Sequence, residues 1–196
     1  MSTPRVLSQP QINMLLVTLE VLAESHTDPK NCFRPVRDLT IVKLFLSTGL
    51  RVQELVNLNI EDLDIEEKQL KVRQGKRGND EYQPIINGKT LEWLNKWLEL
   101  RKQVNSGDPL FISSRGHRIN TDEVRKIVHK ACRVAGLPDW ISCHTFRHSA
   151  ATILLRKSSN LVLVQRFLRH RSIATTSIYC NIVKDDVAAG LELAGL

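Results

Sequence analysis

Hydrophobic residues along this chain recur mainly at helical spacing. In the segment that begins near Ser8, apolar side chains fall three or four residues apart, which places them on one face of a helix. Apolar residues become almost continuous between Val36 and Leu46, and this run predicts a central buried helix that ends at Gly49. Further segments with helical spacing begin at Thr90, Asn120, His144 and Asn160. The pattern therefore predicts a mostly α-helical domain.

Two regions depart from this helical pattern. The segment from His26 to Arg34 contains Asp-Pro and Asn and predicts a loop. Strand-like alternation at Leu70, Val72 and Ile85 surrounds the turn-rich residues 74–80, which indicates an antiparallel β-hairpin. The predicted fold class is thus mostly α with a small antiparallel β-hairpin or sheet, an α+β domain.

Polar groups that can transfer protons or bind an anion lie close together in the sequence between His144 and Tyr179. His144 and Arg147 are three residues apart at the start of a predicted helix, so they share a polar, cationic face. His170 lies just past the end of the helix that Asn160 caps, and a third short helix carries Tyr179. Short helices of this kind can gather two imidazoles, a guanidinium and a phenol around one pocket.

Arg51 stands at a turn that enters another predicted helix, where backbone N–H groups favour an anion. Two interpretations remain open for it, an anion-binding residue or an ordinary surface arginine. Glu54, on the same helix, either orients Arg51 or is simply solvated. Gly75 and Lys76 in the hairpin lack the frame of a nucleotide-binding P-loop.

The charge balance favours a polyanionic partner. Lysine and arginine outnumber aspartate and glutamate by 28 to 21, a formal net charge of +7. Basic residues gather around the helix predicted to begin at Asn120, either as a solvated face or as a surface that follows DNA. These residues are Arg115, His117, Arg118, Arg125, Lys126, Lys130 and Arg133.

Composition also narrows the class of protein and its compartment. A hydrophobic fraction of 42% fits a globular domain, and no run approaches the eighteen apolar residues of a membrane span. The four cysteines form no C-x-x-C pair, which predicts reduced thiols in a cytoplasmic protein. Cys180 fits a small buried residue better than a nucleophile. His144 and His148 lie four apart, but Thr145 replaces the glutamate of a zinc motif, so neither a metal nor another cofactor is expected.

Three short motifs then point to one family. The pattern His-x-x-Arg-His at 144–148, Leu-Arg-His at 168–170 and Thr-Thr-x-x-Tyr at 175–179 resembles the C-terminal motif of tyrosine recombinases, the phage integrase-like enzymes. The sequence Thr-Gly-Leu-Arg-x-x-Glu-Leu at 48–55 resembles their first arginine motif. One departure is Arg169, which replaces a glycine suited to a left-handed helix end.

The resemblance implies site-specific DNA strand cleavage and rejoining through a 3′-phosphotyrosine, without metal or ATP. Tyr179 would be the nucleophile, Lys76 would donate a proton to the departing 5′-oxygen, and His144 or a neighbouring imidazole would be the base. Lys71, Arg77 and Lys89 are alternatives to Lys76. The full catalytic set that the resemblance implies is Arg51, Lys76, His144, Arg147, His170 and Tyr179.

The resemblance also implies an organisation and partners. Residues 1–196 are expected to form a single catalytic domain without the N-terminal domain that clamps the other face of DNA. The tail, about 183–196, would dock on its own domain or on a neighbouring subunit. The expected partner is double-stranded DNA at the nucleoid, with a monomer when free and a tetramer on DNA. Two other functions remain open, type IB topoisomerase-like relaxation and non-catalytic DNA binding by a regulatory relative.

Overall fold

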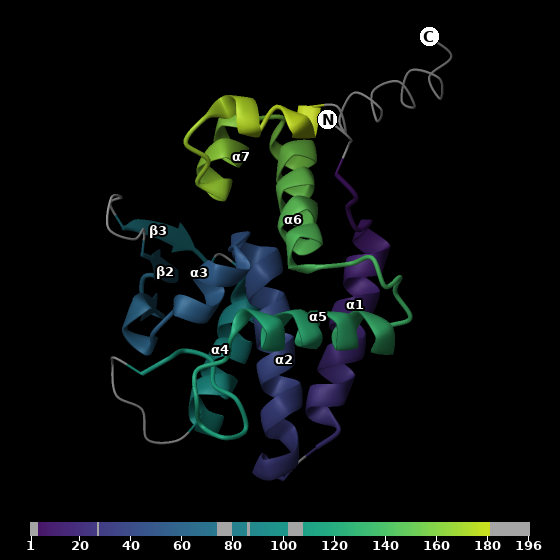
Figure 1. Ribbon diagram of the computed structural model, residues 1–196, viewed down its shortest axis with the longest axis vertical. Helices are drawn as coiled ribbons and strands as arrows, with labels where there is room; N and C mark the ends of the chain where they lie inside the picture. Colours follow the sequence, from purple (N-terminus) through teal and green to yellow (C-terminus); the bar gives the residue numbers. More distant parts are fainter. Residues whose placement is uncertain (1–3, 27, 74–79, 86, 102–107, 181–196) are drawn as a thin grey trace.

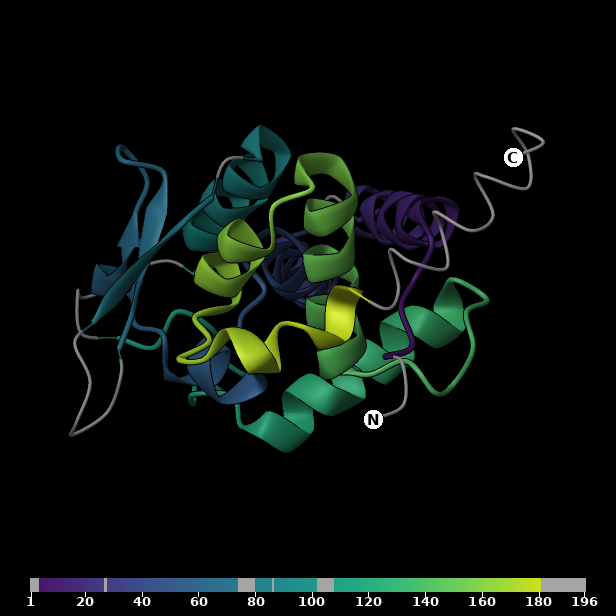
Figure 2. The same ribbon diagram turned by 90° about the horizontal axis from the view of Figure 1, so that it is seen from above.

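The computed structural model describes residues 4–26, 28–73, 80–85, 87–101 and 108–180, which form a helical domain with a small sheet at one side (Figures 1 and 2). The fold class predicted from the sequence is confirmed. The helices are α1 (Gln9–Glu24), α2 (Pro29–Thr48), α3 (Val52–Asn57), α4 (Gly88–Arg101), α5 (Thr121–Val134), α6 (Cys143–Ser158) and α7 (Leu161–Leu168), with 3-10 turns η1 (Ile60–Asp62) and η2 (Ile173–Thr175).

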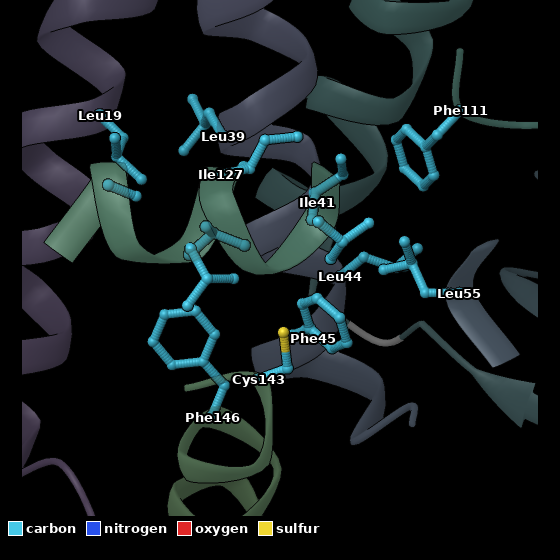
Figure 3. Close-up of a cluster of buried hydrophobic side chains, with 14 of the residues drawn as sticks. Leu19, Leu39, Ile41, Leu44, Phe45, Leu55, Phe111, Ile127, Cys143 and Phe146 are labelled. Carbon is cyan, nitrogen blue, oxygen red and sulfur yellow. The ribbon is translucent and has the colours of Figure 1, made fainter. Parts of the chain in front are cut away.

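Helix α2 lies at the centre of the domain, with α1, α4, α5 and α6 packed against it. Its residues 39–45 are all buried, so this part of the helix has no solvent face. Figure 3 shows Leu39, Leu44 and Phe45 of α2 among buried side chains from α1, α3, α5 and α6. Burial of each such side chain stabilises the fold by about 2 kcal/mol. The predicted central buried helix is confirmed.

Side-chain caps begin several helices where the sequence predicts them. The Ser8 hydroxyl accepts from the Gln11 N–H, and Asn120 forms a reciprocal capping box with Glu123 at the start of α5. Asn160 Oδ1 accepts from the Leu163 N–H at the start of α7. These caps satisfy N–H groups that have no partner within the helix.

The predicted loop at 26–34 is wrong from residue 29 onward, because α2 begins at Pro29. Asp28 caps the helix by accepting from the Lys30 N–H at 2.9 Å, and Pro29 occupies the first helical position, where its missing N–H costs nothing. Pro35 lies within α2 and removes only one helical hydrogen bond. The Asp-Pro pair is thus a helix start.

The predicted hairpin is confirmed and has a further strand. Strands β1 (Leu63–Asp64), β2 (Gln69–Val72) and β3 (Glu81–Pro84) form an antiparallel sheet in that order. Leu70 pairs with Gln83 in the register between β2 and β3, and both side chains are buried. The sheet lies at one edge of the domain, next to α3 and on the same side as α7 (Figures 1 and 2).

A second, smaller hydrophobic cluster joins α6 and α7 to the segment after η2. It contains Ala151, Leu155, Val164, Leu168 and Tyr179. The phenol is thereby packed against both helices. Within the residues that the structure describes, no helix is both long and apolar enough to cross a membrane.

Candidate active site

Arg51 stands at the turn between α2 and α3, as predicted from the sequence. Gly49 ends α2 in the left-handed region with φ of 59°, and Arg51 directly precedes α3. Arg51 Nη1 donates to Glu54 Oε1 at 2.7 Å, and the Arg51 backbone N–H donates to Glu54 Oε2 at 2.7 Å. Glu54 was expected either to orient Arg51 or to be solvated, and these two hydrogen bonds show that it orients Arg51. The Arg51 side chain is 43% exposed, so its guanidinium is accessible to an incoming phosphate.

Arg147 is buried within α6, unlike His144 one turn earlier, whose side chain is exposed. Its guanidinium donates to the carbonyl oxygen of Gly49 and, at 2.5 Å, to that of Leu168. Arg147 therefore connects α6 to the ends of α2 and α7. Burial, and then the charge of Arg51, lower the pKa of Arg147 to about 10, so it remains a cation at neutral pH.

Tyr179 lies beside His148, with its hydroxyl oxygen 2.6 Å from the imidazole Nδ1. The tyrosine is only 1% exposed, and burial raises its pKa to about 12 although the charge of Arg147 opposes this shift. Burial, with the charges of His144 and Arg147, lowers the pKa of His148. At neutral pH the imidazole is therefore uncharged, and in the tautomer with its hydrogen on Nε2 the phenol donates a hydrogen bond to Nδ1.

His170 follows α7 and is half-buried. Its Nδ1 lies 3.0 Å from the Thr176 hydroxyl, which leaves Nε2 for another partner. Burial, and then the charges of Arg147 and Arg51, lower the pKa of His170 to about 4. The neutral imidazole can therefore donate a hydrogen bond from Nε2 while Thr176 donates to Nδ1.

Five of the six predicted site residues are described, and Lys76 lies outside the described residues, between β2 and β3. The electrostatic neighbours of Arg147 include Arg51, Glu54, Arg169 and Tyr179, so these groups form one charged cluster. Of the alternatives to Lys76, Lys71 forms an ion pair with Asp80 at 2.9 Å. The cluster combines three arginines, one carboxylate and a phenol, and the imidazoles of His148 and His170 adjoin it.

Comparison with known proteins decides the family. The model of the phage integrase family matches residues 6–185 of this chain. The chain belongs to the phage integrase family. Tyrosine recombinase XerC of Thermodesulfovibrio yellowstonii is 39% identical over 168 residues, which are 82% of this chain and 54% of the relative. Tyrosine recombinase XerC of Vibrio cholerae is 39% identical over 165 residues, which are 83% of this chain and 51% of that relative.

Solved structures of recombinases share the fold of this phage integrase family member. The XerA recombinase superposes with a TM-score of 0.77 at 31% identity, over 91% of this chain and 61% of that chain. The XerH recombinase bound to palindromic difH substrate, in a post-cleavage complex, gives a TM-score of 0.78 at 26% identity, over 100% of this chain and 54% of that chain. The chain spans about half the length of the curated relatives it matches.

Sequence reasoning did not identify all the groups that arrange this integrase-family site. The backbone carbonyls of Gly49 and Leu168 accept from Arg147, and backbone groups leave no mark in a sequence motif. His148 contacts the phenol across 31 residues, although the resemblance named His144 first and His148 only as a neighbouring imidazole. Arg169, noted as a departure, has a buried side chain that contacts Glu54. Each of these depends on how α6 and α7 pack.

Proposed function

We propose that this chain is the catalytic domain of a site-specific DNA recombinase, which cuts and rejoins strands through a 3′-phosphotyrosine. The observation that carries the proposal is the position of the Tyr179 hydroxyl. It forms a hydrogen bond with His148 Nδ1 at 2.6 Å and lies in the same charged cluster as Arg51 and Arg147. A phosphodiester broken by a side-chain nucleophile requires neutralised oxygens, a base for the nucleophile and an acid for the leaving group.

In the proposed cleavage step the Tyr179 oxygen attacks the scissile phosphorus. The new bond joins phosphorus to the tyrosine oxygen, and the bond between phosphorus and the 5′-oxygen breaks. The phenol proton passes to His148 Nδ1, while Lys76 donates a proton to the departing 5′-oxygen. His144, one turn earlier on α6, is the alternative base.

Arg51, Arg147 and His170 are proposed to bind the non-bridging oxygens of this phosphate. Two of the five N–H groups of Arg147 donate to backbone carbonyls, so three remain for phosphate. His170 Nε2 adds a neutral donor. Tyr179 is 1% exposed, so the proposed attack requires a shift of the segment after η2 that brings its oxygen to phosphorus.

Rejoining reverses these steps. A free 5′-hydroxyl attacks the phosphotyrosine, the bond from phosphorus to the tyrosine oxygen breaks, and His148 returns the proton to Tyr179. The bond energy is kept in the intermediate, so no nucleotide is consumed. Attack by the original strand relaxes DNA, whereas attack by a partner strand recombines it.

Double-stranded DNA is the proposed partner, and the basic residues around α5 support this. The side chains of Arg115, Lys126, Lys130 and Arg133 are exposed, so they are available to phosphates. Arg118 instead donates to the carbonyl of Val56 at 2.8 Å, which ties it to its own domain. We propose that the protein acts at the nucleoid, as a monomer when free and as a tetramer on DNA.

Covalent trapping tests the proposed function. The substrate is a duplex with the sequence of the DNA that flanks the gene, and it carries a bridging phosphorothiolate or a nick. The wild-type protein and Tyr179→Phe are each incubated with this duplex and compared on a denaturing gel. A protein–DNA adduct that Tyr179→Phe abolishes is expected. A shift on a native gel without any adduct would instead indicate DNA binding without catalysis.

A further inference from the structure

Arg169 occupies a backbone position that favours glycine. It follows α7 with φ of 53°, in the left-handed region. Its N–H donates to the Arg166 carbonyl at 2.9 Å, and the His170 N–H donates to the Gln165 carbonyl at 3.1 Å. This pair of bonds closes a helix at a left-handed residue, where any side chain beyond hydrogen adds strain.

The Arg169 side chain points inward and is 1% exposed. Its Nη2 donates to Glu54 Oε2 at 2.7 Å, and its Nη1 donates to Gln83 Oε1 and, at 3.3 Å, to the Phe167 carbonyl. Glu54 lies on α3 and Gln83 on β3, the strand that follows the segment with Lys76. One guanidinium thus connects the start of α3, the hairpin and the turn that carries His170.

Glu54 is shared between two arginines. Its Oε1 accepts from Arg51 Nη1, while its Oε2 accepts from both the Arg51 backbone and Arg169. With glycine at 169, the single carboxylate would cancel the charge of Arg51. With arginine there, the charges of Arg51, Glu54 and Arg169 sum to +1. Arg169 therefore restores the positive potential that a phosphate experiences at Arg51.

We propose that Arg169 is a positioning residue for the cleavage reaction, which acts through Glu54 to hold the Arg51 guanidinium in place and to keep it electropositive. This inference rests on the proposed function, since the ligand of Arg51 is taken to be the scissile phosphate. The Arg169 side chain is only 1% exposed and forms an ion pair with Glu54, so its effect is expected to pass through that carboxylate.

Two substitutions separate the charge of Arg169 from its other properties. Arg169→Met and Arg169→Lys have similar length and the same backbone strain, but only lysine keeps the charge beside Glu54. Arg37→Met is the matched stability control. Arg37 is also a buried arginine, paired with Asp38 at 2.7 Å, and it lies on the N-terminal half of α2 away from the charged cluster.

The first readout is the single-turnover rate of phosphotyrosine formation at saturating DNA, measured together with the DNA dissociation constant. Arg169→Met should lower the rate about tenfold, as expected for coupled residues in one network, and change the dissociation constant less than about twofold. Arg169→Lys should recover most of the rate. Arg37→Met should lower the melting temperature without a comparable loss of rate.

The second readout needs no DNA cleavage. The Arg51 Nε–H resonance, assigned by its loss in Arg51→Lys, should be sharp in the wild-type protein and averaged in Arg169→Met. A separate cleavage measurement uses a duplex with a neutral methylphosphonate at the scissile position. It should narrow the rate difference between wild type and Arg169→Met, because this phosphorus group carries less negative charge for Arg51 to neutralise.

The outcomes distinguish this inference from the proposed function. If wild type forms no adduct, the proposed function fails, and the Arg51 resonance still decides whether Arg169 positions Arg51. An unchanged resonance in Arg169→Met would overturn the inference in either case. Equal rates for wild type and Arg169→Met, or equal losses for the Met and Lys variants, would also overturn it, since then the charge has no role.

Discussion

Two imidazoles lie within two turns of α6 but have different surroundings. His148 is half-buried and contacts the Tyr179 hydroxyl, whereas His144 is exposed at the helix start. Burial, with the charges of His144 and Arg147, lowers the pKa of His148, so it stays unprotonated at neutral pH. A base must be within hydrogen-bond reach of the proton it removes, and His148 meets this condition.

The two histidines are therefore expected to differ in cleavage. His148→Gln should lower the single-turnover rate about a hundredfold, as loss of a general base does, while His144→Gln should lower it less than about tenfold. Rates are measured by covalent trapping. On a bridging phosphorothiolate duplex the leaving thiol needs no acid, so the loss in His148→Gln should persist. A larger loss in His144→Gln would assign the base to His144 instead.

At the scale of elements, the end of α2 is fixed against α7. Gly49 ends α2 with φ of 59°, and a Cβ built on it would lie 2.7 Å from Cε1 of the Phe167 ring. Glycine is required here both for the backbone conformation and for the close approach of Phe167. This contact sets how α7, and therefore His170, lies relative to Arg51.

Replacement of Gly49 by alanine should reveal both requirements. Gly49→Ala should destabilise the protein by about 3 kcal/mol in urea denaturation, from left-handed strain and overpacking together. Gly116 is the matched control, since it has φ of 80° but no atom within 4 Å of an added Cβ. Gly116→Ala should cost about 1 kcal/mol. Phe167→Leu should relieve part of the Gly49→Ala loss, and strictly additive losses would contradict the proposed clash.

Element boundaries were predictable where a local signal dominated. Ser8, Asn120 and Asn160 cap helices as predicted, and Gly49 ends α2, because caps depend on neighbouring residues alone. The start of α2 was mispredicted because an Asp-Pro pair is common both in turns and at helix starts. In the structure Asp28 caps the helix, and Cys32 and Val36 of its first two turns are buried in the core, a tertiary contact that the local sequence does not contain.

At the scale of the whole molecule, the site is assembled from segments that are distant in sequence. The motifs predicted Arg51, Arg147, His170 and Tyr179 as candidate site residues, but not which groups contact one another. Arg147 was expected on a shared polar face with His144, and the structure buries it between two backbone carbonyls. Such contacts follow from three helix ends meeting, so spacing along one helix could not predict them.

The two site arginines consequently differ in what they contribute to the fold. Removal of the Arg147 side chain leaves the carbonyls of Gly49 and Leu168 without this donor, at a cost of about 1 to 3 kcal/mol for each buried group. Arg51 is 43% exposed, and after its removal Glu54 still pairs with Arg169. Exposed ion pairs contribute about 1 kcal/mol or less.

Arg147→Ala is therefore expected to lower the melting temperature by roughly 10 °C, since about 1 kcal/mol corresponds to about 2 to 4 °C in a domain of this size. Arg51→Ala should lower it by no more than about 3 °C, while both variants lose phosphotyrosine formation. Melting is followed by circular dichroism and cleavage by covalent trapping. Equal melting temperatures for the two variants would show that Arg147 contributes to phosphate binding but not to the stability of the fold. A large drop for Arg147→Ala alone would mean that the buried Arg147 guanidinium joins α2, α6 and α7. The ends of α2 and α7, to which it donates, would then also hold it in position to bind the phosphate.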